Sequence, residues 1–386
     1  MMKIPLTKPH IPANLLSGLE AVLRTGVLHG NGEVGQRVER WMQQTYGFRH
    51  VLLTTSGTHA LELAMMLLDA KSGDEAILPS FTFVSTANAV LRRGLVPVFA
   101  EIDKETLNIS PEDVAKRVTP KTRVIIPVHY AGVACDMDAL RSIADEHKLA
   151  IVEDAAHAIG ASYKGRMLGG IGAMGCLSFH DTKNVTCGEG GAFITNDDRL
   201  AARAETIREK GTNRAQFLRG EVDKYTWVDI GSSFVISEIL AALLEAQFAV
   251  IEEITKRRKT IYEFYLTNLR PLEQRGLLRL PVIPPYAQTN YHLFHILLPT
   301  EGIRNALMVH LRNAGIAAAF HYIPLHSSPF GKQFARGELP VTERVSQCLL
   351  RLPLYPDLTE AECSYIVEQI TKFFLKMSGR IRSSFP

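Results

Sequence analysis

Between His50 and about residue 200, the chain alternates short apolar runs with segments that repeat apolar residues at helical spacing. The apolar runs predict strands at 50–54, 75–79, 97–101, 123–129, 149–155, 175–180 and 191–196, with helices between the earlier ones at 57–68, 84–92, 111–117 and 137–147. Strands that are apolar on both faces and separated by helices indicate a parallel sheet covered on both sides. Because no helices separate the last strands, we expect an antiparallel edge or a hairpin there. The pattern predicts an α/β fold.

A second unit is predicted in the C-terminal part of the chain. A long helix is expected from Ser237 to about Leu269, followed by a strand, a helix, a strand and a helix at 292–298, 302–314, 317–322 and 359–377. We therefore predict a large domain with a mostly parallel sheet and an N-terminal segment, residues 1–245, and a smaller α+β domain, residues 246–377. The basic residues 378–386 are expected to form a flexible tail.

Composition excludes several classes of protein. The excess of basic over acidic residues is 43 − 40 = +3, too small for the dense basic face of a nucleic-acid binder. Five cysteines without a CxxC pair argue against a disulfide scaffold or a cysteine zinc site. The N-terminus lacks the apolar core of a signal peptide, and the apolar stretch 234–251 is interrupted by Glu238 and Glu245, which favours a buried helix over a membrane span. We expect a cytoplasmic protein with no membrane or nucleic-acid partner.

Three other motifs suggest functions that their context does not support. Two GxGxxG strings occur, at 30–35 and 170–175, but the first follows a helix-like stretch and the second leads into a strand, whereas a dinucleotide site needs the string between a strand and a helix. His321 and His326 suggest a metal, but they lie five residues apart on a segment broken by Pro324, without carboxylates nearby. Hydrogen bonding at a pocket is the favoured interpretation of these histidines, and no metal is predicted.

Two features predict an anion site and a buried acid. In TTSGTHALELA, residues 54–64, a strand ends at a small turn that opens a helix, so backbone N–H groups with the hydroxyl of Ser56 or Thr58 form an anion site, although both residues are also ordinary N-caps. In IVEDAAHAIG, residues 151–160, Asp154 ends a buried strand. A buried carboxylate needs a cation such as a protonated pyridine nitrogen, and the alternative is an Asp that caps the next turn.

Two more features predict a reactive amine and a ring-covering aromatic side chain. Lys183 lies in SFHDTKNVTCGEGGAFIT, in a loop between two strands, and a lysine that forms an imine is best placed where burial and nearby cations lower its pKa. The alternative is a solvated loop lysine. Phe81 and Phe83 in PSFTFVSTANA follow a strand, and one of them could cover a flat ring, unless both belong to the core. Together the four features match what a protein needs to bind pyridoxal 5′-phosphate. They would hold its phosphate, cover its ring face, pair with its protonated ring nitrogen and bind its aldehyde.

The motifs TSGTHALELA, PSFTFVSTANAV, VHYAGVACDMD, VEDAAHAIGA and SFHDTKNVTCGEGGA resemble the sugar aminotransferases of the DegT/DnrJ/EryC1/StrS family over nearly the whole chain. The resemblance implies the aspartate-aminotransferase type of fold, fold type I of the enzymes that use pyridoxal phosphate. It implies that Lys183 binds the cofactor aldehyde and moves protons and that Asp154 pairs with the ring nitrogen. The remaining cofactor contacts implied are Phe83 on the ring, His157 near the phenolic oxygen, and Ser178, Gly57 and Thr58 at the phosphate.

The resemblance also implies a homodimer with each active site at the subunit interface. Many relatives carry an Asn in a GYNxR-like segment that reaches the neighbour's phosphate, and the matching stretch here is GSSFV, residues 231–235. Ser233 is the candidate for a shorter hydroxyl contact in place of that Asn.

The substrate pocket is predicted from two segments, REKGTNRAQFLRGEVDKYTWVDIGSSF (208–234) and HYIPLHSSP (321–329), which are similar to family members acting on a dTDP-linked sugar. The resemblance implies that glutamate donates an amino group to the 4-keto carbon of dTDP-4-keto-6-deoxyglucose, giving dTDP-4-amino-4,6-dideoxygalactose. The candidate sugar-binding residues are His321, His326, Tyr322 and the cations Lys210, Arg214, Arg219 and Lys224, although 210–219 is equally typical of a solvated loop.

Four alternatives remain open from the sequence. Two are transaminases for another nucleotide-linked ketosugar, acting on a 3-keto acceptor or making a gluco-configured 4-amino product. A third is a dehydratase of the type in which histidine replaces the lysine, which Lys183 argues against although His180 is nearby. The fourth is a non-catalytic nucleotide-sugar binder.

Overall fold

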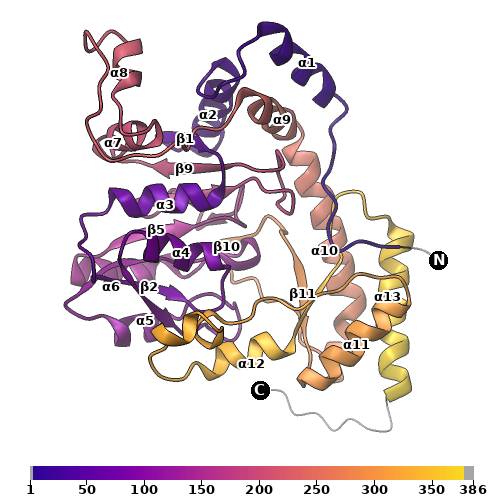
Figure 1. Ribbon diagram of the computed structural model, residues 1–386. Coiled ribbons are helices and arrows are strands. Elements are labelled where there is room, and N and C mark those ends of the chain that lie inside the picture. Colours follow the sequence, from indigo (N-terminus) through magenta and orange to yellow (C-terminus); the bar gives the residue numbers. More distant parts are fainter. Residues whose placement is uncertain (1–2, 378–386) are drawn as a thin grey trace.

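The computed structural model describes residues 3–377, within which seven strands form one twisted sheet in the order β1-β9-β8-β5-β4-β2-β3 (Figure 1). Their bounds are β1 His50–Thr54, β2 Glu75–Pro79, β3 Val96–Ala100, β4 Thr122–Ile125, β5 Ala150–Asp154, β8 Met174–Ser178 and β9 Gly191–Thr195. β9 pairs antiparallel with β1 and with β8, and the pairs from β8 to β3 are parallel. The predicted antiparallel element is therefore present, one position in from the edge. The predicted tail at 378–386 lies outside the described residues.

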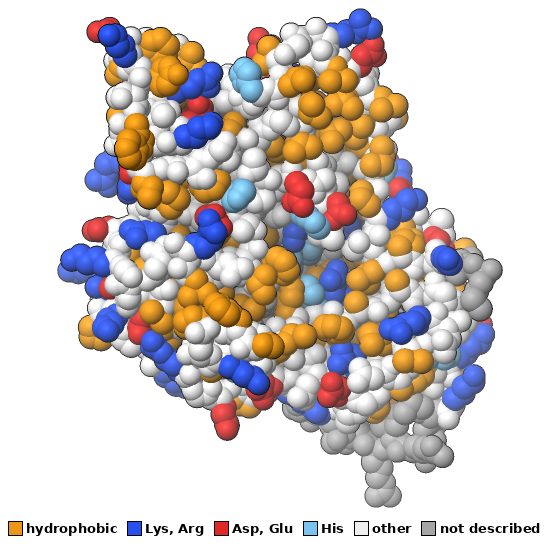
Figure 2. Space-filling model, viewed as in Figure 1, with side chains coloured by type: hydrophobic (Ala, Val, Ile, Leu, Met, Phe, Trp, Pro, Cys, Tyr) orange, Lys and Arg blue, Asp and Glu red, His pale blue; other side chains and the backbone are white. Residues whose placement is uncertain are grey.

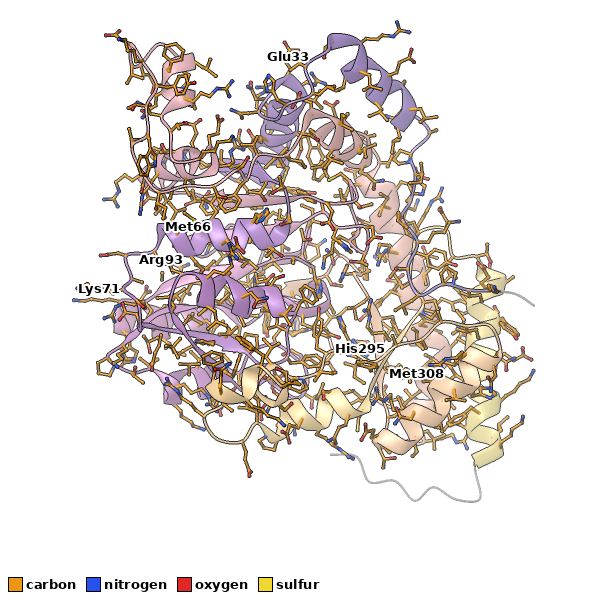
Figure 3. The ribbon with its side chains drawn as sticks, in the orientation of Figure 1. Glu33, Met66, Lys71, Arg93, His295 and Met308 are labelled. Carbon is orange, nitrogen blue, oxygen red and sulfur yellow. The ribbon has the colours of Figure 1, made fainter. Side chains whose placement is uncertain are left out.

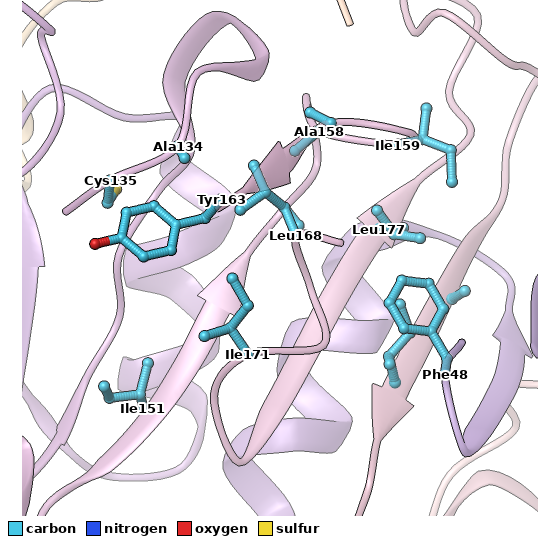
Figure 4. Packing of buried hydrophobic residues seen from close by; sticks show 14 of the residues in the cluster. Phe48, Ala134, Cys135, Ile151, Ala158, Ile159, Tyr163, Leu168, Ile171 and Leu177 are labelled. Carbon is cyan, nitrogen blue, oxygen red and sulfur yellow. The ribbon is translucent and has the colours of Figure 1, made fainter. Parts of the chain in front are cut away.

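Helices cover both faces of this sheet. One face packs against α2 (Glu33–Tyr46), α5 (Pro111–Arg117), α6 (Met137–His147) and α9 (Glu238–Phe248), and the other packs against α3 (Gly57–Leu67), α4 (Val84–Arg92) and α7 (Asp198–Arg208). Figure 4 shows part of the first core, to which Ile151, Leu177 and Phe48 belong. This double coverage explains why the parallel strands are apolar on both faces.

Local capping sets the helix boundaries that the sequence predicted well. Ser110 accepts a hydrogen bond from the Asp113 N–H with Pro111 at the first helical position, so α5 begins where expected. Asp136 caps α6 in the same way through the Ala139 N–H. Ser237 caps α9 through the Leu240 N–H. These side chains bind the N–H groups that the first helical turn leaves free.

The long helix predicted from Ser237 to about Leu269 is wrong, because the chain forms two helices there. α9 ends at Phe248, and α10 runs from Ile251 to Gln274. Between them Val250 has a φ of −122° and a ψ of 14°, outside the helical region. Leu244 and Phe248 of α9 and Ile251 at the start of α10 pack in the core of the main sheet, whereas α10 from Ile261 onward packs in a separate core. The break lets one apolar stretch of sequence serve two cores.

The second unit is built around that separate core. It contains α10, α11 (Glu301–Asn313), α13 (Glu360–Met377) and the antiparallel pair β11 (Phe294–Leu297) and β12 (Leu349–Leu352), with the helices on the right of Figure 1. α12 (Pro340–Cys348) leads into β12. The remaining elements are α1 (Leu15–Thr25), α8 (Arg214–Leu218) and a three-stranded sheet of β10 (Ala287–Gln288), β6 (Ser162–Tyr163) and β7 (Arg166–Met167).

The strand predicted at 317–322 is wrong. This segment pairs with β12 through one bridge, between Ala319 and Arg351, and then leaves it. Its last two residues, His321 and Tyr322, line a cavity instead. The domain boundary predicted near residue 245 stays a proposal.

Both GxGxxG strings bind a carboxylate of the chain itself. The N–H groups of Gly32, Val34 and Gly35 donate to Glu238 at 3.2, 2.8 and 3.0 Å, at the start of α2. Glu238 comes from the apolar stretch 234–251, which is a buried helix as expected, and none of the helices within residues 3–377 is long and apolar enough to cross a membrane.

The second string surrounds Glu153, next to Asp154 on β5. Glu153 accepts hydrogen bonds from the N–H groups of Gly169, Ile171 and Gly172 and from His129. Although burial acts to raise it, these bonds hold the pKa of Glu153 below its ordinary value. The strings are anion-binding loops whose anion is built into the fold.

Candidate active site

A cavity of about 470 Å³ opens at the carboxyl ends of the central strands, where the sheet meets the second unit. Open α/β sheets bind their ligands at this edge. Figure 2 shows histidine and basic side chains gathered in a hollow near the middle of the face that it presents. The residues that line the cavity include Ser56, Gly57, Thr58, Thr82, Phe83, Ser85, Asp154, His157, Ser178, His180, Lys183, Glu189, His292, His321, Tyr322 and Arg351.

One end of the cavity is formed by the first turn of α3. Ser56 caps this helix by accepting a hydrogen bond from the His59 N–H at 3.0 Å. Gly57 packs so closely on β8 that a Cβ at this position would lie 2.8 Å from the Cβ of Ser178. The Thr58 hydroxyl bonds the Ser85 hydroxyl at 2.7 Å. Free N–H groups, hydroxyls and the positive end of the helix dipole make this a site suited to a phosphate.

Asp154 lies at the last position of β5 and is 5% exposed. One carboxylate oxygen accepts from the Thr86 hydroxyl at 2.7 Å and the other from the Ala156 N–H at 3.2 Å. Burial raises the pKa of Asp154, and these bonds, together with the charge of Lys183, oppose the rise in part. The carboxylate is therefore buried and held in one direction, where a cationic ring nitrogen would stabilise its charged form.

Lys183 lies in the loop between β8 and β9. The loop is closed by backbone hydrogen bonds from Phe179 to Gly190 at 2.8 Å and from Asp181 to Gly188 at 3.0 Å. Burial lowers the pKa of the Lys183 amine to about 8, against the opposing charge of Asp154 and with a further lowering by Arg351. A lysine of this kind supplies a neutral, nucleophilic amine near physiological pH.

Aromatic side chains form the walls. Phe81 is buried in the core, whereas Phe83 is 58% exposed and lines the cavity. His157 stacks on His292 with ring centroids 4.2 Å apart, and its Nδ1 is buried without a hydrogen-bond partner among the described residues. Burial and the charge of Lys183 hold the pKa of His157 well below its ordinary range, so the ring is neutral.

These features fit pyridoxal phosphate at separate points. The start of α3 could hold the phosphate, Asp154 could pair with a protonated ring nitrogen, and Phe83 could cover the ring. The unpartnered Nδ1 of His157 could bond the phenolic oxygen. The low-pKa amine of Lys183 lies in the same cavity, as an aldehyde cofactor requires.

A family model described as the DegT/DnrJ/EryC1/StrS aminotransferase family matches residues 9–371. The chain belongs to this family. DesV from S. venezuelae, solved in complex with a ketimine intermediate, is 31% identical, with a TM-score of 0.88 over 99% of this chain and 100% of DesV. The aminotransferase TlmJ from Streptoalloteichus hindustanus is 27% identical, with a TM-score of 0.90 over 97% of this chain and 100% of TlmJ. The putative sugar aminotransferase Spr1654 from Streptococcus pneumoniae, in its PLP form, is 25% identical, with a TM-score of 0.90 over 97% of this chain and 99% of Spr1654.

The protein is thus a sugar aminotransferase of the DegT/DnrJ/EryC1/StrS family, dependent on pyridoxal phosphate and with fold type I. The predicted family, fold class, enzyme class and cofactor are confirmed.

Several residues predicted for the site of this aminotransferase do not line the cavity. Arg214 pairs with Glu209 at 3.2 Å, and Arg219 pairs with Glu205 at 2.8 Å. Lys210 and Lys224 of the same loop also lie outside the lining. Both arginines of the loop 210–224 are thus paired with acids in or next to α7 of the same chain.

Ser233 and His326 are also outside the lining. Ser233 is exposed and forms a backbone bridge with Glu209. His326 is buried and bonds the Ser80 hydroxyl at 2.6 Å. His321 instead bonds the Tyr130 hydroxyl at 3.0 Å and lines the cavity, so the two histidines do not share a site.

Sequence reasoning missed three residues that line this cavity or bond to a residue that lines it. Thr86 binds the Asp154 carboxylate, but its position inside α4 gave no sign of it. His292 was assigned only to a strand. Arg351 stood inside the apolar run LLRLPL, and a charged residue within a buried strand pattern is the signal that could have identified it.

Proposed function

We propose that this aminotransferase works in the cytoplasm and transfers an amino group from glutamate to the 4-keto carbon of dTDP-4-keto-6-deoxyglucose. The product is dTDP-4-amino-4,6-dideoxygalactose, the amino sugar nucleotide of enterobacterial common antigen biosynthesis. The observation that carries the transamination is the amine of Lys183, with a pKa of about 8, in one cavity with the buried carboxylate of Asp154. The sugar assignment is supported by two segments, 208–234 and 321–329, which resemble family members that act on a dTDP-linked sugar. His321 and Tyr322 of the second segment line the cavity.

Pyridoxal phosphate, when bound, supplies an electron sink that stabilises negative charge at the carbon that loses its proton. Asp154 keeps the ring nitrogen protonated, and Thr86 fixes the direction of that carboxylate. The start of α3 with Ser178 holds the phosphate, and Phe83 covers one ring face. His157 bonds the phenolic oxygen as a neutral ring.

Lys183 is the acid and base of both half-reactions. Its neutral Nζ would take the α-proton of glutamate, and in the second half-reaction it would deliver a proton to the sugar C4. Because Lys183 sits on a loop whose base is closed by two backbone hydrogen bonds, the proton arrives from one side of the sugar only. A fixed delivery side sets the configuration at C4, and proton transfer by a positioned group contributes about 10²- to 10⁴-fold to the rate.

We also propose a homodimer with the active site at the subunit interface. The segment around α8 exposes large apolar side chains, among them Trp227, Ile230 and Leu218 at 78%, 66% and 62%, and it projects at the top left of Figure 1. A monomer rarely leaves such a surface in water. This apolar surface is flanked by Arg214, Arg219 and Ser233. A dimer formed through it would place these three residues near the partner's cavity. Sedimentation should give a dimer for the native chain and a monomer for Trp227→Asp; a native monomer contradicts the proposal.

The substrate is tested with glutamate and dTDP-4-keto-6-deoxyglucose, with the C4 configuration of the product determined by NMR. An axial amine supports the proposal, an equatorial amine indicates a gluco-configured product, and turnover of a 3-keto sugar alone indicates the other acceptor class. The joint replacement Arg214→Ala and Arg219→Ala should raise the KM for the nucleotide sugar with little change in the KM for glutamate. An unchanged KM for the nucleotide sugar would mean that Arg214 and Arg219 do not bind the substrate.

A further inference from the structure

His180 is a histidine of the cavity that the functions assigned above do not use. It follows β8 on the same loop as Lys183, and both side chains line the cavity. The Lys183 N–H donates to the His180 carbonyl at 2.9 Å, so one turn of the chain carries both residues. The two hydrogen bonds at the base of the loop hold this turn in place. One loop therefore presents an amine and an imidazole to the same space.

His180 differs from the other histidines around the site in its surroundings. Burial, together with neighbouring cations, holds the pKa of His157, His292 and His321 below the ordinary range, so these three cavity rings are neutral. Figure 3 shows His295, which lies between the sheet and the helices of the second unit, outside the cavity lining, and burial lowers its pKa to about 3. Rings that stay neutral are poor proton donors.

Both ring nitrogens of His180 have a carboxylate nearby. Nδ1 lies 2.9 Å from Asp181 and 3.0 Å from the Thr182 hydroxyl, and Nε2 lies 3.7 Å from Glu189. Negative charges this close stabilise a protonated ring, and the Lys183 amine opposes them only while it is charged. The side chain is 43% exposed, so it can exchange protons with water. Because Nε2 forms no hydrogen bond with any residue in 3–377, a proton on it is available to a ligand in the cavity.

Amino transfer to a ketone needs a proton that Lys183 does not supply. When the amine nitrogen bonds to the sugar C4, the bond between C4 and O4 must break, and O4 must leave as water. O4 takes one proton from the attacking nitrogen and needs a second one from an acid. The Tyr322 hydroxyl also lines the cavity, but it lies 3.4 Å from Nε2 of His157, and burial raises its pKa, which makes it a weaker donor.

We propose that His180 is a second catalytic acid and base, which gives this proton to O4 from Nε2 and regains it from solvent. In the donor half-reaction the neutral ring works in reverse. Nε2 takes one proton from the water whose oxygen bonds to the α-carbon, the bond between that carbon and nitrogen breaks, the nitrogen takes the second proton, and the keto acid leaves. Lys183 then moves the protons on carbon, and His180 moves the protons on oxygen.

Because the inference rests on the proposed glutamate donor and ketosugar acceptor, it is tested first without sugar. The cofactor-loaded protein is mixed with glutamate. The loss of cofactor absorbance reports the step of Lys183, and the appearance of free 2-oxoglutarate, measured with a coupling enzyme, reports the step that uses water. His180→Gln should leave the absorbance change within about twofold of the native rate and slow the release of keto acid at least about 100-fold. In His180→Ala, added imidazole should restore part of the release rate.

Asp181→Asn removes the carboxylate beside Nδ1 and should slow the release about three- to tenfold. This variant also tests the idea if His180→Gln fails to fold. His147→Gln, at a partly exposed histidine of α6 beside Glu146, is the matched control and should leave both rates unchanged.

Two measurements that do not depend on turnover separate proton transfer from a structural role. The dissociation constant of the cofactor should be the same in His180→Gln as in the native protein. The pH midpoint for acylation of Lys183 by a small anhydride, measured without cofactor, should also be unchanged. The amine form of the protein, mixed with dTDP-4-keto-6-deoxyglucose, should react about 100-fold more slowly in His180→Gln.

Three results would overturn the proposal. If the release of keto acid keeps pace with the absorbance change in His180→Gln, His180 supplies no proton. If both fall together and imidazole restores neither, the residue is structural. If the dissociation constant of the cofactor rises, His180 binds the cofactor. The absorbance change of the native protein with glutamate checks the donor, and its reaction with the ketosugar checks the acceptor, so failure of either assignment is distinguishable from failure of this one.

Discussion

The low pKa of Lys183 leads to a prediction on the cofactor-free protein. The amine has a pKa of about 8 in place of the ordinary 10.5. At pH 7.5 about one amine in four is then neutral, against about one in a thousand for an ordinary lysine, a difference of more than about two hundred-fold. Acylation of Lys183 by a small anhydride, quantified by peptide mass spectrometry against pH, measures the neutral fraction directly. The profile should have its midpoint near pH 8.

Asp154→Asn tests which charges set the pKa of Lys183. The Asp154 charge acts to raise the pKa of Lys183, so its removal should move the midpoint below pH 8. Asp181→Asn removes an exposed carboxylate from the same loop and serves as the control, with an unchanged midpoint. A native midpoint near pH 10, or an upward shift in Asp154→Asn, would refute the reasoning.

The same pKa has a consequence for stability. The folded-state pKa lies below the unfolded-state value, so the charged amine destabilises the cofactor-free fold below pH 8. This penalty fades as the pH rises from 8 to 10.5. The free energy of unfolding of the native protein, relative to Lys183→Met at each pH, should therefore rise across this interval. The change is at most about 3 kcal/mol, since the side chain keeps some contact with water.

Three further changes have defined outcomes. Lys183→Ala should abolish turnover and the absorbance of the lysine-bound cofactor. Normal turnover in this variant would show that Lys183 has no catalytic role. Gly57→Ala places a Cβ 2.8 Å from the Cβ of Ser178 at the predicted phosphate site. The dissociation constant of the cofactor, measured by equilibrium dialysis, should therefore rise at least about tenfold. An unchanged constant would mean that the phosphate binds elsewhere. Glu238→Ala leaves three amide groups at the start of α2 without their acceptor. The free energy of unfolding, measured in urea, should fall by about 2–4 kcal/mol. Glu245→Ala, also on α9, is the control and should not cause a loss of this size.

Local sequence patterns were sufficient for much of the fold. Apolar periodicity placed α4, α5 and α6 at their observed bounds, because in these elements local preference and tertiary packing agree. The break at Val250 was not predictable in this way. The sequence AQFAVIEE contains neither Gly nor Pro, and the two helices pack for most of their length in different cores, which no local pattern shows.

The candidate site was partly predictable for a similar reason. Asp154 lies at the end of one predicted strand and Lys183 follows another, so the rule that ligands bind at the carboxyl ends of parallel strands brings them together. His292 and Arg351 come from the second unit, whose placement against the sheet no local pattern encodes. Residues 208–234 look like a diphosphate-binding stretch by charge, but within one chain their arginines pair with neighbouring acids.

The two glycine loops show what such a motif does and does not specify. Their geometry requires a negative group but carries no information on whether that group is a diffusible nucleotide or a side chain from another part of the same chain. A tethered carboxylate is present at a constant, high local concentration, so a nucleotide cannot compete for the loop while the fold is intact. Removal of Glu238 would vacate one of these loops, and the vacated amides would then be open to sulfate or phosphate from solution.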